Sequence, residues 1–113
     1  MIKAKFYRKN NKIFGFKIVG HAGYADEGED IVCSAVTILV INTINALEAF
    51  TQAHLICEAD EVNGGDISLT LPELKSGKED HDVTLLLDTM YLGLSDVEKN
   101  YGKYITITDE EVL

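Results

Sequence analysis

The chain has 113 residues, with 10 Lys and Arg against 19 Asp and Glu, and a formal net charge of −9. That length can bury one hydrophobic core unaided, so we expect a single domain over residues 1–113. Hydrophobic residues make up 46% of the chain and there is a single proline, which excludes a disordered or fibrous protein. The acidity argues against direct nucleic-acid binding, which depends on basic contacts to phosphates.

Signals for export or membrane insertion are not evident. The N-terminal stretch MIKAKFYRKN lacks the apolar segment and the small-residue cleavage site of a signal peptide. The longest apolar run, Ile31 to Ile41, falls short of the roughly 20 residues that a membrane-spanning helix needs. The two cysteines, Cys33 and Cys57, are too few for a disulfide framework. We therefore expect a cytoplasmic protein with reduced thiols and no membrane association.

Basic and acidic residues are unevenly distributed along the chain. All 19 acids follow residue 17, whereas the first part contains only basic charges, namely Lys3, Lys5, Arg8, Lys9, Lys12 and Lys17. The acidic part is suited to attract a cationic partner such as a basic peptide. A solvated surface that only keeps the protein soluble is the alternative interpretation.

Alternating polarity predicts a β-hairpin at the start of the chain. Residues 2–9 alternate between apolar and polar or basic side chains, and residues 14–18 repeat the pattern. The pair Asn10-Asn11 between them favours a tight turn. A polar loop over residues 20–30 follows the second strand.

Residues 31–53 predict a long and unusually apolar helix. Its polar side chains recur at helical spacing and form one narrow stripe, made of Ser34, Thr37, Asn45, Glu48 and Gln52. A helix with so thin a polar stripe must be covered on most of its sides. We expect it to lie against a sheet and to be covered further by a partner subunit.

A second hairpin and a last strand are predicted after the long helix. The alternating segments 56–62 and 66–72 flank Asn63-Gly64-Gly65, which has the chemistry of a turn. Residues 104–108 predict one more strand before an acidic tail.

A second helix is predicted between those strands. Apolar residues recur at helical spacing from Val83 to Tyr101, and Gly102 is placed to cap the C-terminal end. Residues 76–79 fit a capping box, although a start a few residues later is also compatible. The order ββαββαβ predicts an α+β domain in which a mixed or antiparallel sheet packs against a long buried helix and a second amphipathic helix.

The stretch GHAGYADEGEDIVC contains the candidate catalytic residues. Asp30 is placed to cap the long helix, which would put Cys33 in the first turn, where free amides and the helix dipole stabilise a thiolate. His21 ends the second strand, and an imidazole near Cys33 would raise the thiolate fraction and later protonate the leaving amine. Glycines between the two residues would let the loop bend over a substrate. The nearby acids oppose this chemistry, because negative charge raises the pKa of a thiol.

Other interpretations stay open at the level of residues. A lone Cys and His do not define a catalytic pair, so the alternative is that Cys33 is a buried thiol and His21 a loop residue. A zinc site could combine the His-x-x-Cys pair His54 and Cys57 with His21, Cys33 and His81, but it lacks the tight cysteine pair typical of zinc. His54 and His81 fit surface positions better, and Cys57 fits a buried thiol in a strand. A redox-sensing Cys33 would lack a nearby resolving cysteine. We expect no metal or cofactor.

The whole stretch resembles the signature of the ribosomal-processing cysteine protease Prp family. The resemblance is carried by Gly20-His21-Ala22-Gly23-Tyr24-Ala25, by Gly28, and by Asp30-Ile31-Val32-Cys33 with Ser34-Ala35-Val36. It extends over the chain, through the similar length, the basic N-terminal hairpin, the buried helix after the cysteine and the acidic close. Ser34 stands where alanine is common in the family, which is a small change.

The resemblance implies a cysteine endopeptidase without a cofactor. Family members are homodimers that remove a short N-terminal extension from a large-subunit ribosomal protein, number twenty-seven, by cutting after an aromatic residue and before a small one. By position, Cys33 would be the nucleophile and His21 the base. The loop with Gly20, Gly23 and Gly28 would move to admit the peptide, while Asp30 would cap the helix or orient His21. The main rival is a non-catalytic module of the same fold that binds a basic ribosomal partner.

Overall fold

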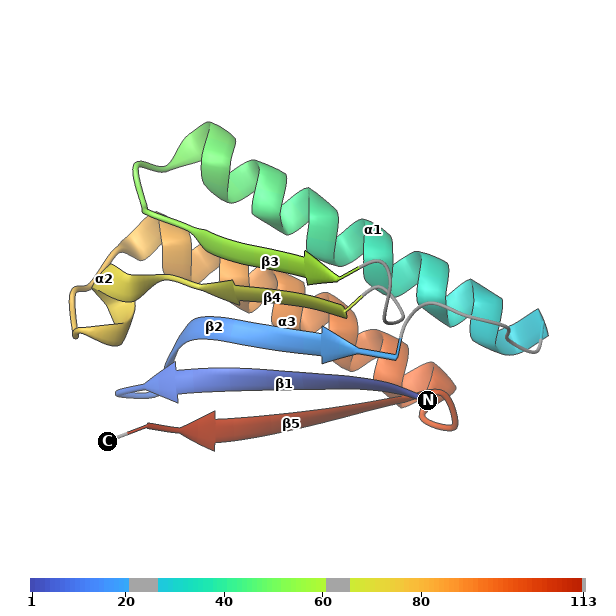
Figure 1. Ribbon diagram of the computed structural model, residues 1–113. Helices are drawn as coiled ribbons and strands as arrows, with labels where there is room; N and C mark the ends of the chain where they lie inside the picture. Colours follow the sequence, from blue (N-terminus) through green and yellow to red (C-terminus); the bar gives the residue numbers. More distant parts are fainter. Residues whose placement is uncertain (21–26, 61–65, 113) are drawn as a thin grey trace.

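The computed structural model describes residues 1–20, 27–60 and 66–112, and it forms a five-stranded sheet with two long helices on one face (Figure 1). The strands are β1 (Ile2–Lys9), β2 (Lys12–Val19), β3 (Ile56–Asp60), β4 (Asp66–Thr70) and β5 (Ile105–Glu111). The helices are α1 (Glu27–Phe50), α2 (Pro72–Lys75) and α3 (His81–Tyr101). This order confirms the predicted α+β domain and adds the short helix α2.

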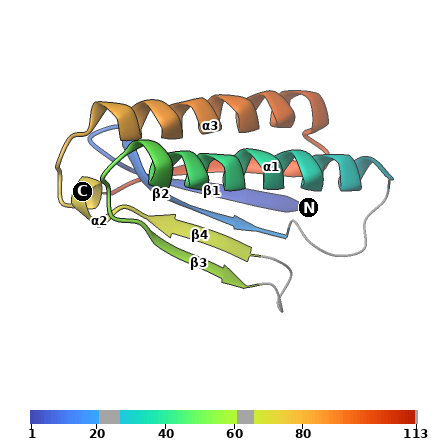
Figure 2. The same cartoon turned by 90° about the horizontal axis from the view of Figure 1, so that it is seen from above.

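The sheet is mixed, and its strands lie in the order β3-β4-β2-β1-β5. Strand β1 pairs antiparallel with β2, β2 with β4, and β4 with β3, whereas β5 runs parallel to β1. The helices α1 and α3 lie side by side over one face of the sheet (Figure 2). The opposite face carries no long helix in the described part of the chain, so the domain has two layers.

The predicted N-terminal hairpin is confirmed, and its turn has the expected chemistry. Asn10 and Asn11 have φ angles of 51° and 64°, in the left-handed region that two-residue hairpin turns require. Asparagine tolerates this region better than most residues do. Across the turn, Lys9 pairs with Lys12, which sets the register of the two strands.

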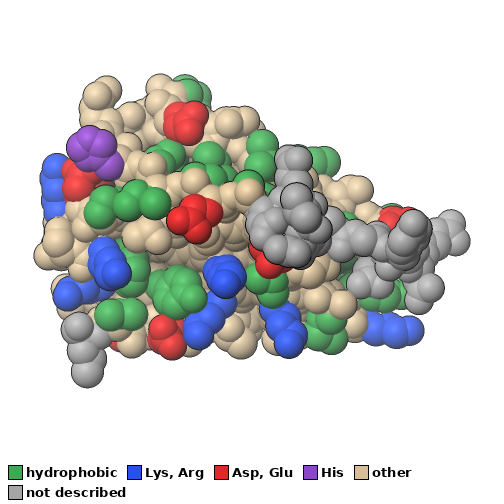
Figure 3. Space-filling view, in the orientation of Figure 1, with side chains coloured by type: hydrophobic (Ala, Val, Ile, Leu, Met, Phe, Trp, Pro, Cys, Tyr) green, Lys and Arg blue, Asp and Glu red, His purple; other side chains and the backbone are tan. Residues whose placement is uncertain are grey.

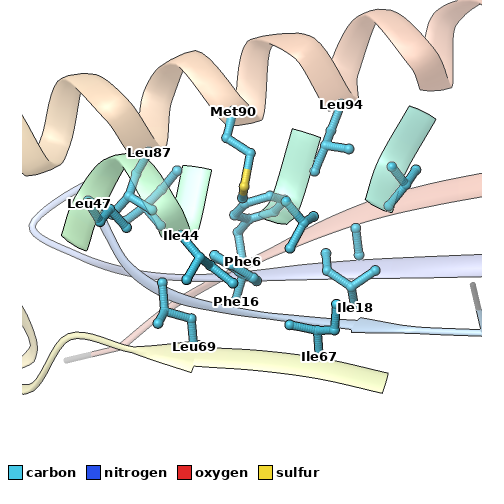
Figure 4. Packing of buried hydrophobic residues seen from close by; sticks show 14 of the residues in the cluster. Phe6, Phe16, Ile18, Ile44, Leu47, Ile67, Leu69, Leu87, Met90 and Leu94 are labelled. Atoms are coloured by element: carbon cyan, nitrogen blue, oxygen red, sulfur yellow. The ribbon is translucent and has the colours of Figure 1, made fainter. Parts of the chain in front are cut away.

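The hydrophobic core fills the space between the sheet and the two long helices (Figure 4). Phe6 and Phe16, on neighbouring strands, have ring centroids 6.0 Å apart. Phe6 also meets the edge of Tyr91 from α3, with the centroids 4.8 Å apart and the rings at 76°. The helices add further fully buried side chains, among them Val32, Val36, Val40 and Leu47 of α1 and Val83, Leu87, Met90 and Leu94 of α3.

The predicted sheet contact of α1 is confirmed, but α1 is covered only where it faces the sheet and α3. On its outer side Ile31 is 56% exposed and Ile38 is 67% exposed, and Phe50 near its end is 75% exposed. On α3, Leu85 and Leu92 are 56% and 63% exposed. Cover of this surface by a partner subunit therefore stays a prediction.

One helix has the length and composition of a membrane span. The segment Asp30–Phe50 of α1 covers 21 residues with a mean hydropathy of 1.8. This segment is longer than the apolar run noted in the sequence, because it also includes the polar residues that end that run. One third of this segment is buried inside the domain. Packing of that side on the sheet is typical of the core helix of a globular domain.

The helix α3 begins at His81 and not within the predicted capping box. Asp80 is its N-cap, and its carboxylate accepts hydrogen bonds from the amides of Asp82 at 3.1 Å and Val83 at 3.2 Å. The start at the capping box was wrong and the later start that the sequence also allowed is confirmed, because Asp80 supplies the same acceptor closer to the apolar run. The predicted C-cap at Gly102 is confirmed, with a right-handed φ of −58°.

The basic first strand lies beside the acidic last strand, which the sequence did not predict. The Nε of Arg8 donates to Oδ1 of Asp109 at 2.7 Å, and the Nζ of Lys5 lies 3.4 Å from Oε1 of Glu110. The hydroxyl of Tyr91 donates to the other carboxylate oxygen of Asp109 at 2.7 Å, and the Arg8 guanidinium lies over the Tyr91 ring. Lys and Arg side chains gather on the open face of the sheet (Figure 3). Part of the N-terminal positive charge is thus neutralised by β5.

Candidate active site

Cys33 lies in the second turn of α1. The helix begins at Glu27, so Cys33 is its seventh residue and Asp30 its fourth. The predicted N-cap role of Asp30 and the first-turn position of Cys33 are therefore wrong. Carboxylates suit the first turn of a helix, so the acidic stretch around Gly28 starts the helix instead of preceding it.

This placement changes what can activate Cys33. Backbone amides beyond the first turn are used by the hydrogen bonds of the helix itself, and the effect of the helix dipole falls off within that turn. The exposed Asp30, almost one turn before Cys33, adds negative charge, which disfavours a thiolate. A reactive thiolate at Cys33 therefore depends mainly on a nearby base.

Gly20 sets the point where the chain leaves the end of β2. Its φ is +80°, and a Cβ at this position would lie 2.5 Å from the carbonyl oxygen of Met1. Both facts exclude a side chain here without a shift of the backbone. The Gly20 amide also donates to Oδ1 of Asp66 at 3.4 Å, which ties this point to β4. Gly20 thus anchors the start of the segment that contains His21.

The other predicted loop residues are only partly described. His21 and Gly23 lie outside the described residues, so contact between His21 and Cys33 stays a prediction. Gly28 lies in α1 and not in a loop, because the helix starts earlier than predicted. The end of β2 and the start of α1 lie at the same end of the molecule (Figure 1), as a catalytic pair drawn from these two elements would require.

The surface of α1 around Cys33 forms a shallow depression of about 400 Å³. Its lining consists of Cys33, Ser34, Thr37 and Ile38. Cys33 is half-buried and packs against the core, so the residue is partly accessible while its Cα is held by a rigid helix. The sequence assigned Thr37 only to a polar stripe, but its spacing of four from Cys33 already places both residues on one flank of a helix.

Cys57 has a different environment and is a poor nucleophile. It was expected to be buried, but its side chain is exposed because β3 is the edge strand of the sheet. Partial desolvation of its sulfur, followed by the negative charges of Glu48 and Glu58, raises the pKa of the Cys57 thiol. A raised pKa leaves less thiolate near neutral pH, and the thiolate is the reactive form.

The residues of the hypothetical zinc site are not assembled in the described chain. His54 and His81 are at the surface, as predicted. The backbone amide of His54 donates to Oε1 of Glu73 at 3.0 Å, and its ring Nδ1 lies 2.9 Å from the same oxygen. These hydrogen bonds, with a smaller effect of Lys78, lower the pKa of Glu73. Among residues 1–20, 27–60 and 66–112, no three His, Cys, Asp or Glu side chains lie close enough to hold a metal ion.

Comparison with known proteins gives one consistent result. The model of a protein family described as cysteine protease Prp matches residues 1–106. The ribosomal processing cysteine protease Prp of Bacillus subtilis (strain 168) is 29% identical over 109 residues, which covers 96% of each chain. The relative of the same name from Staphylococcus aureus (strain Mu50) is 26% identical over 88 residues, or 78% of each chain.

Solved structures share the fold. The crystal structure of SMU.848 from Streptococcus mutans has a TM-score of 0.89 and 32% identity, and the match covers 99% of this chain and 96% of that one. The ribosomal processing protease Prp from S. aureus, solved in complex with a substrate peptide, has a TM-score of 0.86 at 22% identity, covering 97% and 100% of the two chains. From these matches and the family match over residues 1–106, the chain belongs to the cysteine protease Prp family.

Proposed function

We propose that this protease removes the N-terminal extension of a large-subunit ribosomal protein, number twenty-seven, by cutting after an aromatic residue and before a small one. Membership of the Prp family makes the chain a cysteine protease, and its relatives are named for ribosomal processing. Cys33 would be the nucleophile and His21 the base. The cytoplasm would be the place of reaction.

The observation that carries the proposal is the contrast between the two cysteines. Cys33 is partly accessible, sits in a surface depression of a rigid helix and occupies the position that matches the family signature. Cys57 lies on an edge strand, where desolvation and two carboxylates raise the pKa of its thiol. The raised pKa of the Cys57 thiol, together with the position of Cys33 in the family signature, favours Cys33 as the reactive thiol.

In the proposed reaction, His21 takes the proton from Sγ of Cys33, and the thiolate attacks the carbonyl carbon of the peptide bond that is cleaved. The peptide C–N bond breaks, His21 returns the proton to the leaving amine, and a thioester joins Cys33 to the extension. A water molecule that gives a proton to His21 then attacks the thioester carbonyl. The extension leaves as an acid, and the proton returns to the Cys33 thiol.

The acidic surface supports a basic substrate. An enzyme with a net charge of −9 attracts a ribosomal protein and its basic extension over distances comparable to the Debye length. Screening by salt weakens that attraction, so kcat/KM should fall as the salt concentration rises. Equal values at low and high salt would exclude electrostatic steering.

The outer side of the helices supports a homodimer. An apolar stripe, made of Ile31 and Ile38 on α1 and Leu85 and Leu92 on α3, is exposed in one chain. A second copy would cover it, so sedimentation should give a dimer for the wild type and a monomer for Ile38→Asp. Phe50→Asp, at an exposed apolar residue outside the stripe, is the matched control and should stay dimeric. A monomeric wild type would refute the dimer.

A cleavage assay tests the proposed function directly. The purified protein is mixed with a synthetic peptide that spans the junction between extension and mature ribosomal protein, and the products are read by mass spectrometry. Cleavage after the aromatic residue should be lost in Cys33→Ala and His21→Ala, whereas His81→Ala, a remote exposed histidine, should cleave normally. Normal cleavage by Cys33→Ala would reject the nucleophile. Tight binding without cleavage by the wild type would favour the rival, a non-catalytic binding module.

A further inference from the structure

The outer edge of β3 is a free sheet edge. β3 lies at one end of the strand order, and no strand of the described chain pairs with its outer side. Alternate N–H and C=O groups along that side are therefore not used by the sheet and can pair with an added strand. The side chains of Ile56, Cys57, Glu58 and Ala59 are all exposed. Proteins usually protect such an edge from pairing with other chains. An open edge next to the helix that carries Cys33 is therefore a candidate binding site for an extended peptide.

The side of β3 that faces the helices is also uncovered. Cys57 pairs with Leu69 of β4, and Ala59 pairs with Ile67. Directly paired residues point to the same side of a sheet, and Leu69 and Ile67 are buried beneath the helices. Cys57 and Ala59 therefore point toward the helix layer, yet both are exposed. The helix α1 thus leaves part of β3 open, and Cys57 and Ala59 mark one side of a surface here called the α1–β3 ledge.

The other side of the α1–β3 ledge is the flank of α1 that carries Cys33. Leu39 of α1 lies against Gly93, so the side of α1 that bears Leu39 faces α3. Helical spacing puts the opposite flank at Cys33, Thr37, Ile44 and Glu48. Glu48 is close enough to Cys57 for its charge to act on that thiol, which places this flank toward β3. Cys33 therefore lies on the same flank as Glu48, further toward the start of α1.

We propose that the substrate peptide binds as an added strand on the outer edge of β3 and continues along the α1–β3 ledge to Cys33. The inference rests on the proposed protease function of Cys33. Glu48 and Cys33 are 15 residues apart in one helix (48 minus 33), which corresponds to about 22 Å along its axis. An extended peptide covers that distance with about seven residues. The strand-paired part of the substrate therefore lies several residues away from the bond that is cut.

Charge favours a basic peptide as the occupant. Glu48 is exposed on the flank of α1 beside the α1–β3 ledge, and Glu58 is exposed on β3, where its side chain points to the open face of the sheet. Among the described residues no Lys or Arg forms a salt bridge with either one. A cationic peptide would supply the missing partner charges. Backbone pairing holds the chain in extended form without selecting its sequence, whereas side chains that point alternately toward α1 and toward the open face provide selection.

Hydrogen exchange tests the backbone pairing. Cys33→Ala protein is saturated with the synthetic junction peptide, and amide exchange is followed by mass spectrometry. The peptide should slow exchange in residues 56–60, whereas β5, which forms the opposite edge of the sheet, serves as an internal control and should not change. Unchanged exchange in 56–60 with bound peptide would overturn the inference. So would protection, without peptide, of those amides in residues 56–60 that do not pair with β4, because a second copy would then occupy the edge.

Two further measurements use affinity. The double variant Glu48→Lys and Glu58→Lys, in the Cys33→Ala background, should bind the peptide about tenfold more weakly. Glu79→Lys with Asp82→Lys, at exposed acids around the start of α3, makes the same change in net charge and should bind normally. Methylation of single peptide amides four to seven residues from the cut should weaken binding at every second position. If the wild type cleaves the peptide but methylation does not weaken binding at alternate positions, only the added-strand proposal is rejected. If the wild type does not cleave the peptide at all, the proposed function is rejected as well.

Discussion

Replacement of Gly20 by alanine should damage both stability and catalysis. Two separate effects oppose the substitution. The φ of +80° costs a residue with a Cβ roughly 1–2 kcal/mol. The new Cβ would also lie 2.5 Å from the Met1 carbonyl oxygen, and relief of such a contact by a backbone shift costs roughly 1–3 kcal/mol. We therefore expect a loss of about 2–5 kcal/mol in the free energy of unfolding.

The chain offers a matched control for the first effect. Gly77 also has a positive φ, of 104°, but nothing lies within 4 Å of the position of its Cβ. Gly77→Ala should therefore lose only the roughly 1–2 kcal/mol of backbone strain. Urea denaturation of both variants separates the contact with Met1 from the strain. A chain of 113 residues is expected to have a stability of about 6–17 kcal/mol, so both variants should still fold.

Catalysis provides the second measurement on the same two variants. Gly20 directly precedes His21, so a shift of the backbone at Gly20 is passed on to the proposed base. A misplacement of about 1 Å can reduce a rate by about 100-fold, and we expect a fall of this size in kcat/KM for Gly20→Ala. Gly77→Ala should keep normal activity. Equal losses of stability in the two variants, together with full activity of Gly20→Ala, would refute the reasoning.

Two further predictions concern Tyr91 and Cys57. Tyr91→Phe removes the 2.7 Å hydrogen bond to Asp109 and should lower the free energy of unfolding by about 1 kcal/mol. That hydrogen bond, with partial burial, raises the pKa of Tyr91, so its stabilising effect is complete below about pH 10 and is lost as the pH rises through the higher folded-state pKa. Urea denaturation at a series of pH values above pH 9 should show this loss of stability in the wild type and not in Tyr91→Phe. The same pH dependence of the free energy of unfolding in both proteins would contradict the prediction. In Cys33→Ala protein, the raised pKa of Cys57 should make alkylation by iodoacetamide at pH 7 slower than that of glutathione, whereas a faster rate would contradict the assigned environment.

Local patterns in the sequence predicted most of the elements correctly. The N-terminal hairpin followed from strict alternation around an asparagine pair, and both asparagines take the φ values that such a turn needs. The long helix and α3 followed from helical spacing of apolar residues, since their buried sides are the ones that the spacing defined. These features depend on neighbours in the chain, so the sequence alone contains the required information.

Features that depend on distant segments were missed. The parallel pairing of β5 with β1 joins residues about one hundred positions apart, and no local pattern indicates it. The start of α1 was placed too late because glycine and acids around Gly28 are typical of a loop as well as of a first turn. That error carried over to Asp30 and Cys33, whose proposed roles had been derived from a later start. The flank of α1 that faces β3 could not be identified from the sequence either, because its identification depends on where the sheet lies.

The uneven charge of the chain now has a physical explanation that leads to a last prediction. Three basic residues of the first hairpin form salt bridges within the molecule, namely Lys5, Arg8 and Lys12. The acids next to the proposed path of the peptide, Glu48 on α1 and Glu58 on β3, have no such partner among the described residues. Attraction of a basic peptide should therefore be concentrated at the ledge and not spread over the whole surface.

The salt dependence of catalysis distinguishes these two possibilities. In the wild type, kcat/KM should fall between low salt and about 0.15 M, where the Debye length is about 8 Å. The double variant Glu48→Lys and Glu58→Lys should lose most of that dependence. The double variant Glu79→Lys and Asp82→Lys should keep it, although both double variants change the net charge equally. If both double variants lose the salt dependence of kcat/KM to the same extent, the net charge of the protein steers the substrate, and the acids near the ledge contribute no more than other acids. If only the variant of Glu48 and Glu58 loses it, these two acids attract the peptide to its path along α1 and β3, because charge beside the bound peptide acts more strongly than distant charge at this screening length.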